Sequence, residues 1–369
     1  MKKIIVLLVG MLFCVTSLSY AQNLNWNLTG AGARAAGFGG AFIGVADDAT
    51  AISWNPAGLT QLIDPEFSAV MRYINDSYKY VEREEENTVS IGHFTPNFMS
   101  AVYPFDFGGR SIVAGIAYQQ MLDFYSEGVD YETTGGIFTM SLGLGAQILP
   151  VLSVGVTSNV WTGNYKLEVI NKSDGENFSG FNFNLGAMLN LDNLNSPIPV
   201  KIGFGFKSPF DLNSDLDYSV QMPTMIGVGG SVRLGDNLTV ACDYETRAYG
   251  SSNIVPENGD EYPLSYYDLN QLRVGAEYLL VTDFAVIPLR AGFHTFPTTF
   301  SNYEDYPDGR IDQVVGSGFA IGTGLIFEKI AIDATVTMDS FKQDLIEAFG
   351  KYTELSTTTF TLSGILYLN

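Results

Sequence analysis

A two-residue alternation of apolar and polar positions organises most of the chain. Between residues 138 and 148 the even positions are apolar, whereas the odd positions are Thr, Ser, Gly and Gln. The segments 111–124 and 181–191 divide in the same way. Because successive side chains of a β-strand point to opposite faces, this pattern predicts strands with one apolar and one small or polar face. Further segments of this kind lie at 66–80, 87–106, 151–162, 199–208, 221–234, 238–249, 269–280, 285–296, 314–327, 330–341 and 356–368.

The links between these segments alternate in length. Short links, such as 107–109 and 235–237, alternate with long acidic links, such as 126–133 and 302–312. A soluble sandwich or propeller would also alternate along its strands, but it has no reason to sort its links by length. We therefore expect an all-β fold, a transmembrane antiparallel β-barrel of about 14 strands with short periplasmic turns and long extracellular loops.

The N-terminus has the features of an export signal. Lys2 and Lys3 precede an apolar stretch over 4–15, and Ser19-Tyr20-Ala21 resembles a cleavage site. Residues 1–21 are therefore predicted to be a signal peptide. No later apolar run reaches the length of about 20 residues that a membrane-spanning helix needs. With the barrel pattern, export predicts the outer membrane of a Gram-negative bacterium.

Charge and cysteine content exclude several classes of function. Without Lys2 and Lys3 the chain has 17 basic and 40 acidic residues, which is a net charge of −23. Such a charge repels nucleic acid. Cys242 is the only cysteine after the signal, and the two histidines lie far apart in the sequence. The sequence contains no nucleophile-elbow or phosphate-loop motif. We expect no enzyme activity, no cofactor and no metal site.

Residues 24–59 do not follow the alternation. A Gly/Ala-rich segment, GAGARAAGFGGAF, is followed by VADDAT and then by WNPAGL. This order resembles the N-terminal region of the FadL/TodX family of outer-membrane transport proteins. The motif residues that carry the resemblance are Asn55, Pro56, Ala57, Asp47, Asp48 and Arg34.

The resemblance implies a small hatch, residues 22–62, that plugs a barrel formed by residues 63–369. It also implies passive uptake of hydrophobic compounds, either long-chain fatty acids or aromatic hydrocarbons. The expected partners are those small molecules and the lipid and lipopolysaccharide of the outer membrane, and the protein is expected to be a monomer. The same stretch also resembles the start of PorV-type proteins, which implies an alternative function as an outer-membrane shuttle of the type IX secretion pathway.

Small hatch residues also make physical sense, because they pack inside a lumen lined by Ser, Gly, Thr and Asn. The Gly-x-Gly steps at 143/145, 203/205, 227/229 and 316/318 predict places where the hatch or a neighbouring strand comes close. Asp47 and Asp48 have two readings. They pair with Arg34 or with a lumen cation, or they shape the turn before a short helix.

A hydrophobic solute needs apolar residues inside the barrel. Leu24, Trp26 and Leu28 are predicted to form an apolar stopper at the mature N-terminus, and the alternative for Trp26 is anchoring at the membrane interface. Val113, Met121 and Trp161 interrupt otherwise polar inner faces, and the alternative for each of them is packing against the hatch. The family resemblance further implies a kinked third strand that opens a lateral path into the membrane. Gly115 is the position in this chain where we expect that kink.

Overall fold

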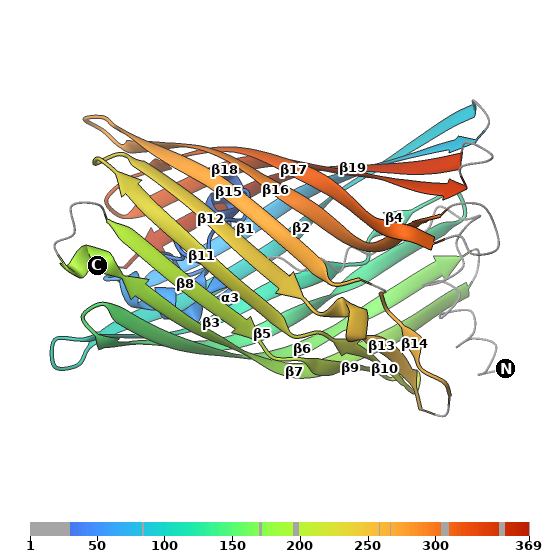
Figure 1. Cartoon of the computed structure of the whole chain (residues 1–369), viewed down its shortest axis with the longest axis horizontal. Helices are drawn as coiled ribbons and strands as arrows, with labels where there is room; N and C mark the ends of the chain where they lie inside the picture. Colours follow the sequence, from blue (N-terminus) through green and yellow to red (C-terminus); the bar gives the residue numbers. More distant parts are fainter. Residues whose placement is uncertain are drawn as a thin grey trace.

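The computed structural model describes residues 30–82, 85–169, 172–194, 199–257, 259–265, 267–303, 310–346 and 351–368. Within these residues the strands form one closed antiparallel barrel of fourteen wall strands (Figure 1), which confirms the predicted fold class. The barrel closes where β1 (Glu66–Glu82) pairs with β19 (Lys351–Tyr367), from Glu66↔Tyr367 to Val81↔Tyr352. No helix in this part of the chain is long and apolar enough to cross a membrane.

Most wall strands are single uninterrupted segments. These are β1, β2 (Glu85–Asp106), β5 (Tyr131–Leu149), β6 (Leu152–Val169), β7 (Lys172–Asn190), β16 (Val286–Tyr303), β17 (Arg310–Ile326), β18 (Ile330–Ile346) and β19.

The other five wall strands are each broken into two segments. The pairs are β3 (Ser111–Asp123) with β4 (Ser126–Glu127), β8 (Val200–Lys207) with β9 (Phe210–Ser214), β10 (Tyr218–Met222) with β11 (Met225–Leu234), β12 (Leu238–Arg247) with β13 (Asn253–Pro256), and β14 (Tyr262–Pro263) with β15 (Leu269–Val281).

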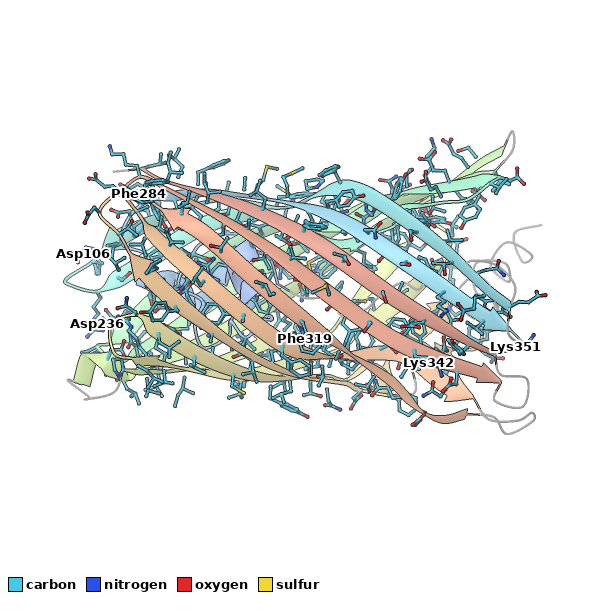
Figure 2. The ribbon with its side chains drawn as sticks, turned by 90° about the horizontal axis from the view of Figure 1, so that it is seen from above. Asp106, Asp236, Phe284, Phe319, Lys342 and Lys351 are labelled. Atoms are coloured by element: carbon cyan, nitrogen blue, oxygen red, sulfur yellow. The ribbon has the colours of Figure 1, made fainter. Side chains whose placement is uncertain are left out.

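The predicted alternation separates the two faces of the wall. In β5, Met140 and Leu142 are 53% and 61% exposed on the outside, whereas Thr139 and Ser141 are buried inside. Figure 2 shows Asp106 and Asp236 at the end of the barrel that carries the short turns, with Lys342 and Lys351 at the other end. The outer surface between the two ends is therefore apolar, as a surface in contact with lipid must be.

Residues 30–62 of the predicted hatch lie inside the barrel, nearer the end with the short turns (blue in Figure 1). It contains the short helices α2 (Ala33–Gly37) and α3 (Ala51–Trp54) and the 3₁₀ helix η1 (Pro56–Gln61). Two further 3₁₀ turns occur in the wall. η2 (Leu191–Leu194) lies in the link between β7 and β8, and η3 (Tyr249–Ser251) lies in the break between β12 and β13.

The third wall strand contains a bulge away from Gly115. Gly115 pairs regularly on both sides, with Val102 of β2 and Gly143 of β5, and the kink at Gly115 stays a prediction. The register with β5 shifts instead between Gln120 and Leu122. A bulge adds one residue to one strand and so reverses the faces of the residues after it.

This bulge corrects the predicted facing of the end of β3. The alternation places Leu122 and Phe124 on the outer face together with Ile116. Ile116 is indeed exposed, but Leu122 and Phe124 are buried, at 5% and 4% exposure. The extra residue at Met121 therefore moves two large apolar side chains into the lumen.

Candidate functional site

The Asn-Pro-Ala motif joins two parts of the hatch to the wall. Asn55 is extended (φ −152°), and its side-chain oxygen accepts a hydrogen bond from Ala57 N at 3.2 Å. Its amide nitrogen donates to Ile43 O at 2.9 Å and to Ala187 O of β7 at 3.2 Å. Pro56 begins η1, where its fixed φ suits the first helical position and its missing N–H costs no hydrogen bond.

Wall glycines allow the backbone of the hatch to lie directly against the strands. A Cβ at Gly155 would lie 2.3 Å from Pro56 C, and one at Gly203 would lie 2.1 Å from Ile43 O. The predicted Gly-x-Gly positions are confirmed as places of close approach. Those at 143/145, 203/205 and 227/229 face the hatch, and those at 316/318 face neighbouring wall strands.

Hydrogen bonds fasten the hatch to the wall on several sides of the lumen. They connect hatch backbone atoms to side chains of five strands: Thr157 of β6 with Ile52 O (3.0 Å), Ser231 of β11 with Gly44 O (2.9 Å), Asp243 of β12 with Ile43 N (2.7 Å), Thr335 of β18 with Ala33 O (2.7 Å) and Ser363 of β19 with Ala33 N (2.7 Å). Residues 30–62 are therefore packed against the wall on several sides rather than attached to it as a loose tail.

Arg34 is the electrostatic centre of the contact between hatch and wall. It forms an ion pair with Asp47 inside the hatch and two 3.0 Å hydrogen bonds with Glu277 of β15. Glu277 also accepts from Arg290 at 2.6 Å, and Arg290 donates to Asp333 at 2.6 Å. Burial lowers the pKa of Arg34, but Asp47 and Glu277 outweigh it and raise that pKa well above its ordinary value.

The two adjacent acids differ in their contacts. Asp47 pairs with Arg34, whereas Asp48 accepts hydrogen bonds from Thr50 N at 2.8 Å and Thr50 Oγ1 at 2.5 Å. Asp48 therefore shapes the turn into α3, and burial raises the pKa of its carboxyl. Asp47 therefore has the predicted pairing with Arg34, and Asp48 has the predicted contacts of a residue that shapes a turn.

An apolar cluster lines one side of the lumen beyond the hatch. Trp161 contacts Phe210, which packs against the cluster, with tilted rings whose centroids lie 4.7 Å apart, and the Trp161 indole donates to Asn182 at 2.9 Å. Leu122 and Phe124, which the bulge turns inward, belong to the same cluster. Met121 packs at its edge and lines a small cavity of about 40 Å³ beside Trp161. This group of residues is called the apolar cluster below.

The remaining candidate residues lie elsewhere. Val113 is buried among hatch residues such as Ala57 and Leu59, so it supports the plug. Leu24, Trp26 and Leu28 lie outside the described residues.

A larger cavity of about 280 Å³ lies between the hatch and the outer half of the wall. Gly40 and Trp54 of the hatch line it on one side. Unlike the apolar cluster, it contains many polar and charged side chains, among them Arg72, Asp76, His93, Asn97, Gln120, Asp123, Arg273, His294, Asp339 and four threonines. This cavity is called the polar chamber below.

The polar chamber borders a break in the wall. The ladder between β2 and β3 runs only from Phe98↔Gln119 to Asp106↔Ser111. Among the described residues, the part of β2 before Phe98 therefore has no backbone partner in β3. His93 and Asp123 bridge this break through side chains, with Nε2 and Oδ2 2.9 Å apart.

Comparisons of the sequence with family models and curated proteins give no match. Comparisons of the structure do. A FadL homologue from Pseudomonas aeruginosa is 14% identical and superimposes with a TM-score of 0.69, over 94% of this chain and 100% of that one. The chain has the FadL/TodX fold. The toluene transporters TodX of P. putida (14% identity, TM-score 0.65) and TbuX of Ralstonia pickettii (16%, 0.61) share it, each over 93% of this chain and 100% of theirs.

Within this FadL/TodX fold, several charged residues of the inner wall were not among the candidates predicted from the sequence. Glu245, bound by Arg273 at 3.0 and 3.1 Å, and the Glu277–Arg290–Asp333 chain were not singled out. The sequence contained a signal for these residues, because they occupy the polar positions of the predicted strands. Charged side chains in that phase face the lumen, where they must find partners.

Proposed function

We propose that the protein is an outer-membrane channel for passive uptake of hydrophobic compounds, with a plugged barrel and a lateral exit. One observation carries this proposal: the apolar cluster of Trp161, Phe210, Leu122 and Phe124 lies inside a barrel whose inner face also carries many polar and charged side chains. A channel for polar solutes has no use for such a surface. Solved structures of the same fold include two described as toluene transporters.

The energetic reason is the cost of apolar surface in water. Transfer from lipid into water costs about 25 cal/mol per Å², so a molecule with roughly 200 Å² of apolar surface loses about 5 kcal/mol in a wet channel. An apolar surface inside the lumen removes much of that cost. The hatch meanwhile closes the barrel to ions and small polar solutes, since it is bonded to strands on several sides of the lumen.

The break between β2 and β3 supports the lateral exit. It lies beside Met121 and Leu122, so a solute that leaves the apolar cluster reaches the wall where backbone hydrogen bonds are missing among the described residues. A solute that leaves there enters lipid without crossing the periplasm. In this proposal, residues 22–62 act as the hatch, and Leu24, Trp26 and Leu28 act as its apolar stopper.

Mass spectrometry of material that copurifies with the protein tests this function. We expect a fatty acid or an aromatic hydrocarbon in preparations of the natural sequence, and about tenfold less in Trp161→Ala, because truncation removes the largest side chain of the cluster. Phe319→Ala is the matched control, since Phe319 is 55% exposed on the outer wall and does not line the lumen (Figure 2).

Two results would count against uptake. Equal amounts of hydrophobic compound in Trp161→Ala and Phe319→Ala would show that the cluster is not the binding surface. A stoichiometric secreted protein without any bound lipid would favour the PorV-type shuttle function instead.

A further inference from the structure

The polar chamber contains a row of side chains that the proposed function does not use. Direct ladder partners in six neighbouring strands form this row, so all of them face the lumen at one level. In order from β15 to β1 they are Arg273, His294, Gly318, Asp339, Thr357 and Asp76. Such a row across the wall is a built surface rather than a chance cluster of charges.

Gly318 allows the row to form. A Cβ at this position would lie 2.0 Å from Asp339 Oδ1 and 2.3 Å from His294 Nε2. The absence of a side chain on β17 lets the two flanking residues meet above it, with Nε2 and Oδ1 2.9 Å apart. Any other residue at 318 would separate them.

The carboxylates of the chamber have unused hydrogen-bonding capacity. Thr357 donates to Asp76 Oδ1 at 2.5 Å. Within the described part of the chain, Oδ1 of Asp339 is buried and has no hydrogen-bond partner, and Asp339 and Asp76 both line the chamber. A carboxylate oxygen beside a cavity is a strong acceptor for a ligand that donates a hydrogen bond.

The charge of the chamber selects among ligands. Three carboxylates, Asp76, Asp123 and Asp339, face the cavity together with His93 and His294. Arg72 is the cation available to balance them in the described structure, because Arg273 is held by Glu245 through two hydrogen bonds. The three carboxylates outnumber Arg72, so the chamber disfavours a carboxylate ligand.

The chamber is also amphipathic. Met121 and Leu122 line it on one side, and Phe296 and Leu355 line it on the other. Its volume of about 280 Å³ is close to the lower end of the range for small-molecule pockets. An apolar body can therefore contact these side chains while its polar group reaches the row.

We propose that the polar chamber binds the head group of an amphiphile that donates a hydrogen bond, such as an alcohol, a phenol or an amine, and that it disfavours carboxylates. Asp76 and Asp339 accept the hydrogen bond, and the apolar residues hold the body. This assignment rests on the proposed uptake of hydrophobic compounds and narrows their class.

Three probes with one aromatic body test the assignment: 4-ethylphenol, ethylbenzene and 4-ethylbenzoate. Their binding to the full-length protein in lipid nanodiscs is measured by equilibrium dialysis, corrected with empty nanodiscs. We expect 4-ethylphenol to bind about tenfold more tightly than either other probe at neutral pH. In Asp76→Asn combined with Asp339→Asn, the preference for the phenol over the benzoate should fall by about tenfold, because the amides accept more weakly and repel the benzoate less.

The matched control is Asp106→Asn combined with Asp236→Asn, which removes the same charge at the turns seen in Figure 2 and should leave all three affinities unchanged. If the chamber double variant does not fold, Asp339→Asn alone should show the same change with a smaller amplitude.

Each contrary outcome is distinct. Equal binding of phenol and ethylbenzene, or a phenol preference that survives in the chamber variants, would overturn the head-group assignment and leave uptake standing. Tightest binding of the benzoate would also overturn it, and would point to the basic side of the lumen at Lys207 and Arg247. Binding of none of the probes would overturn both this assignment and the proposed function.

Discussion

The substitution Gly155→Ala should displace the hatch without disturbing the barrel. Gly155 lies on β6 directly beneath the Asn-Pro-Ala turn, and an added Cβ would lie 2.3 Å from Pro56 C and 2.4 Å from Ala57 N. Both atoms belong to the backbone, so no side-chain rotation can relieve the overlap. Overpacking of this kind costs about 1–3 kcal/mol. An energy of that size raises the population of a displaced hatch by about 5- to 150-fold.

Gly364→Ala is the matched control. Gly364 also lies in a wall strand, but a Cβ there has no atom within 4 Å. Single-channel conductance in planar bilayers measures the open fraction, and heat-modifiability on gels reports whether the barrel is folded. We expect frequent openings in Gly155→Ala and none beyond the natural level in Gly364→Ala. Identical recordings from the two folded variants would refute the idea that the turn rests on the glycine.

Three further predictions concern the hatch. Deletion of residues 22–60 should leave a folded barrel with raised nonspecific conductance, and unchanged conductance would mean that this segment is not a plug. Arg34→Gln should destabilise the hatch by about 1–3 kcal/mol. This is less than the loss of one partner from a fully buried ion pair, because Arg34 and Asp47 are 20% and 28% exposed. Hydrogen exchange of hatch amides should rise relative to the control Arg233→Gln, since Arg233 is exposed. Burial raises the pKa of Asp48 in the folded hatch, so protonation of Asp48 stabilises the folded hatch. This stabilisation is fully present below the ordinary carboxyl pKa of about 4 and is lost as pH rises through the higher pKa of the folded state. Asp48→Asn should remove this pH dependence of hatch exchange, and an unchanged pH profile would assign it to another group.

The alternation determined the inside and outside of the wall, because a strand side chain can point only to one face or the other. It also determined the number of wall strands and the close-approach glycines, such as Gly143 and Gly203, since only a small residue admits a neighbouring backbone. The hatch was recognisable because residues 24–59 break the alternation. These features depend on local chain geometry, which a single sequence encodes directly.

The tertiary structure decided which inward residues meet. The bulge at Met121 reversed Leu122 and Phe124, and a period of two contains no signal for one extra residue. His294 and Asp339 meet only because the register of three strands sets them at one level across Gly318. Register depends on pairing between strands far apart in sequence, so the alternation gives the face of each residue but not its height along the barrel. The apolar cluster and the polar chamber therefore became visible only once the strands were paired.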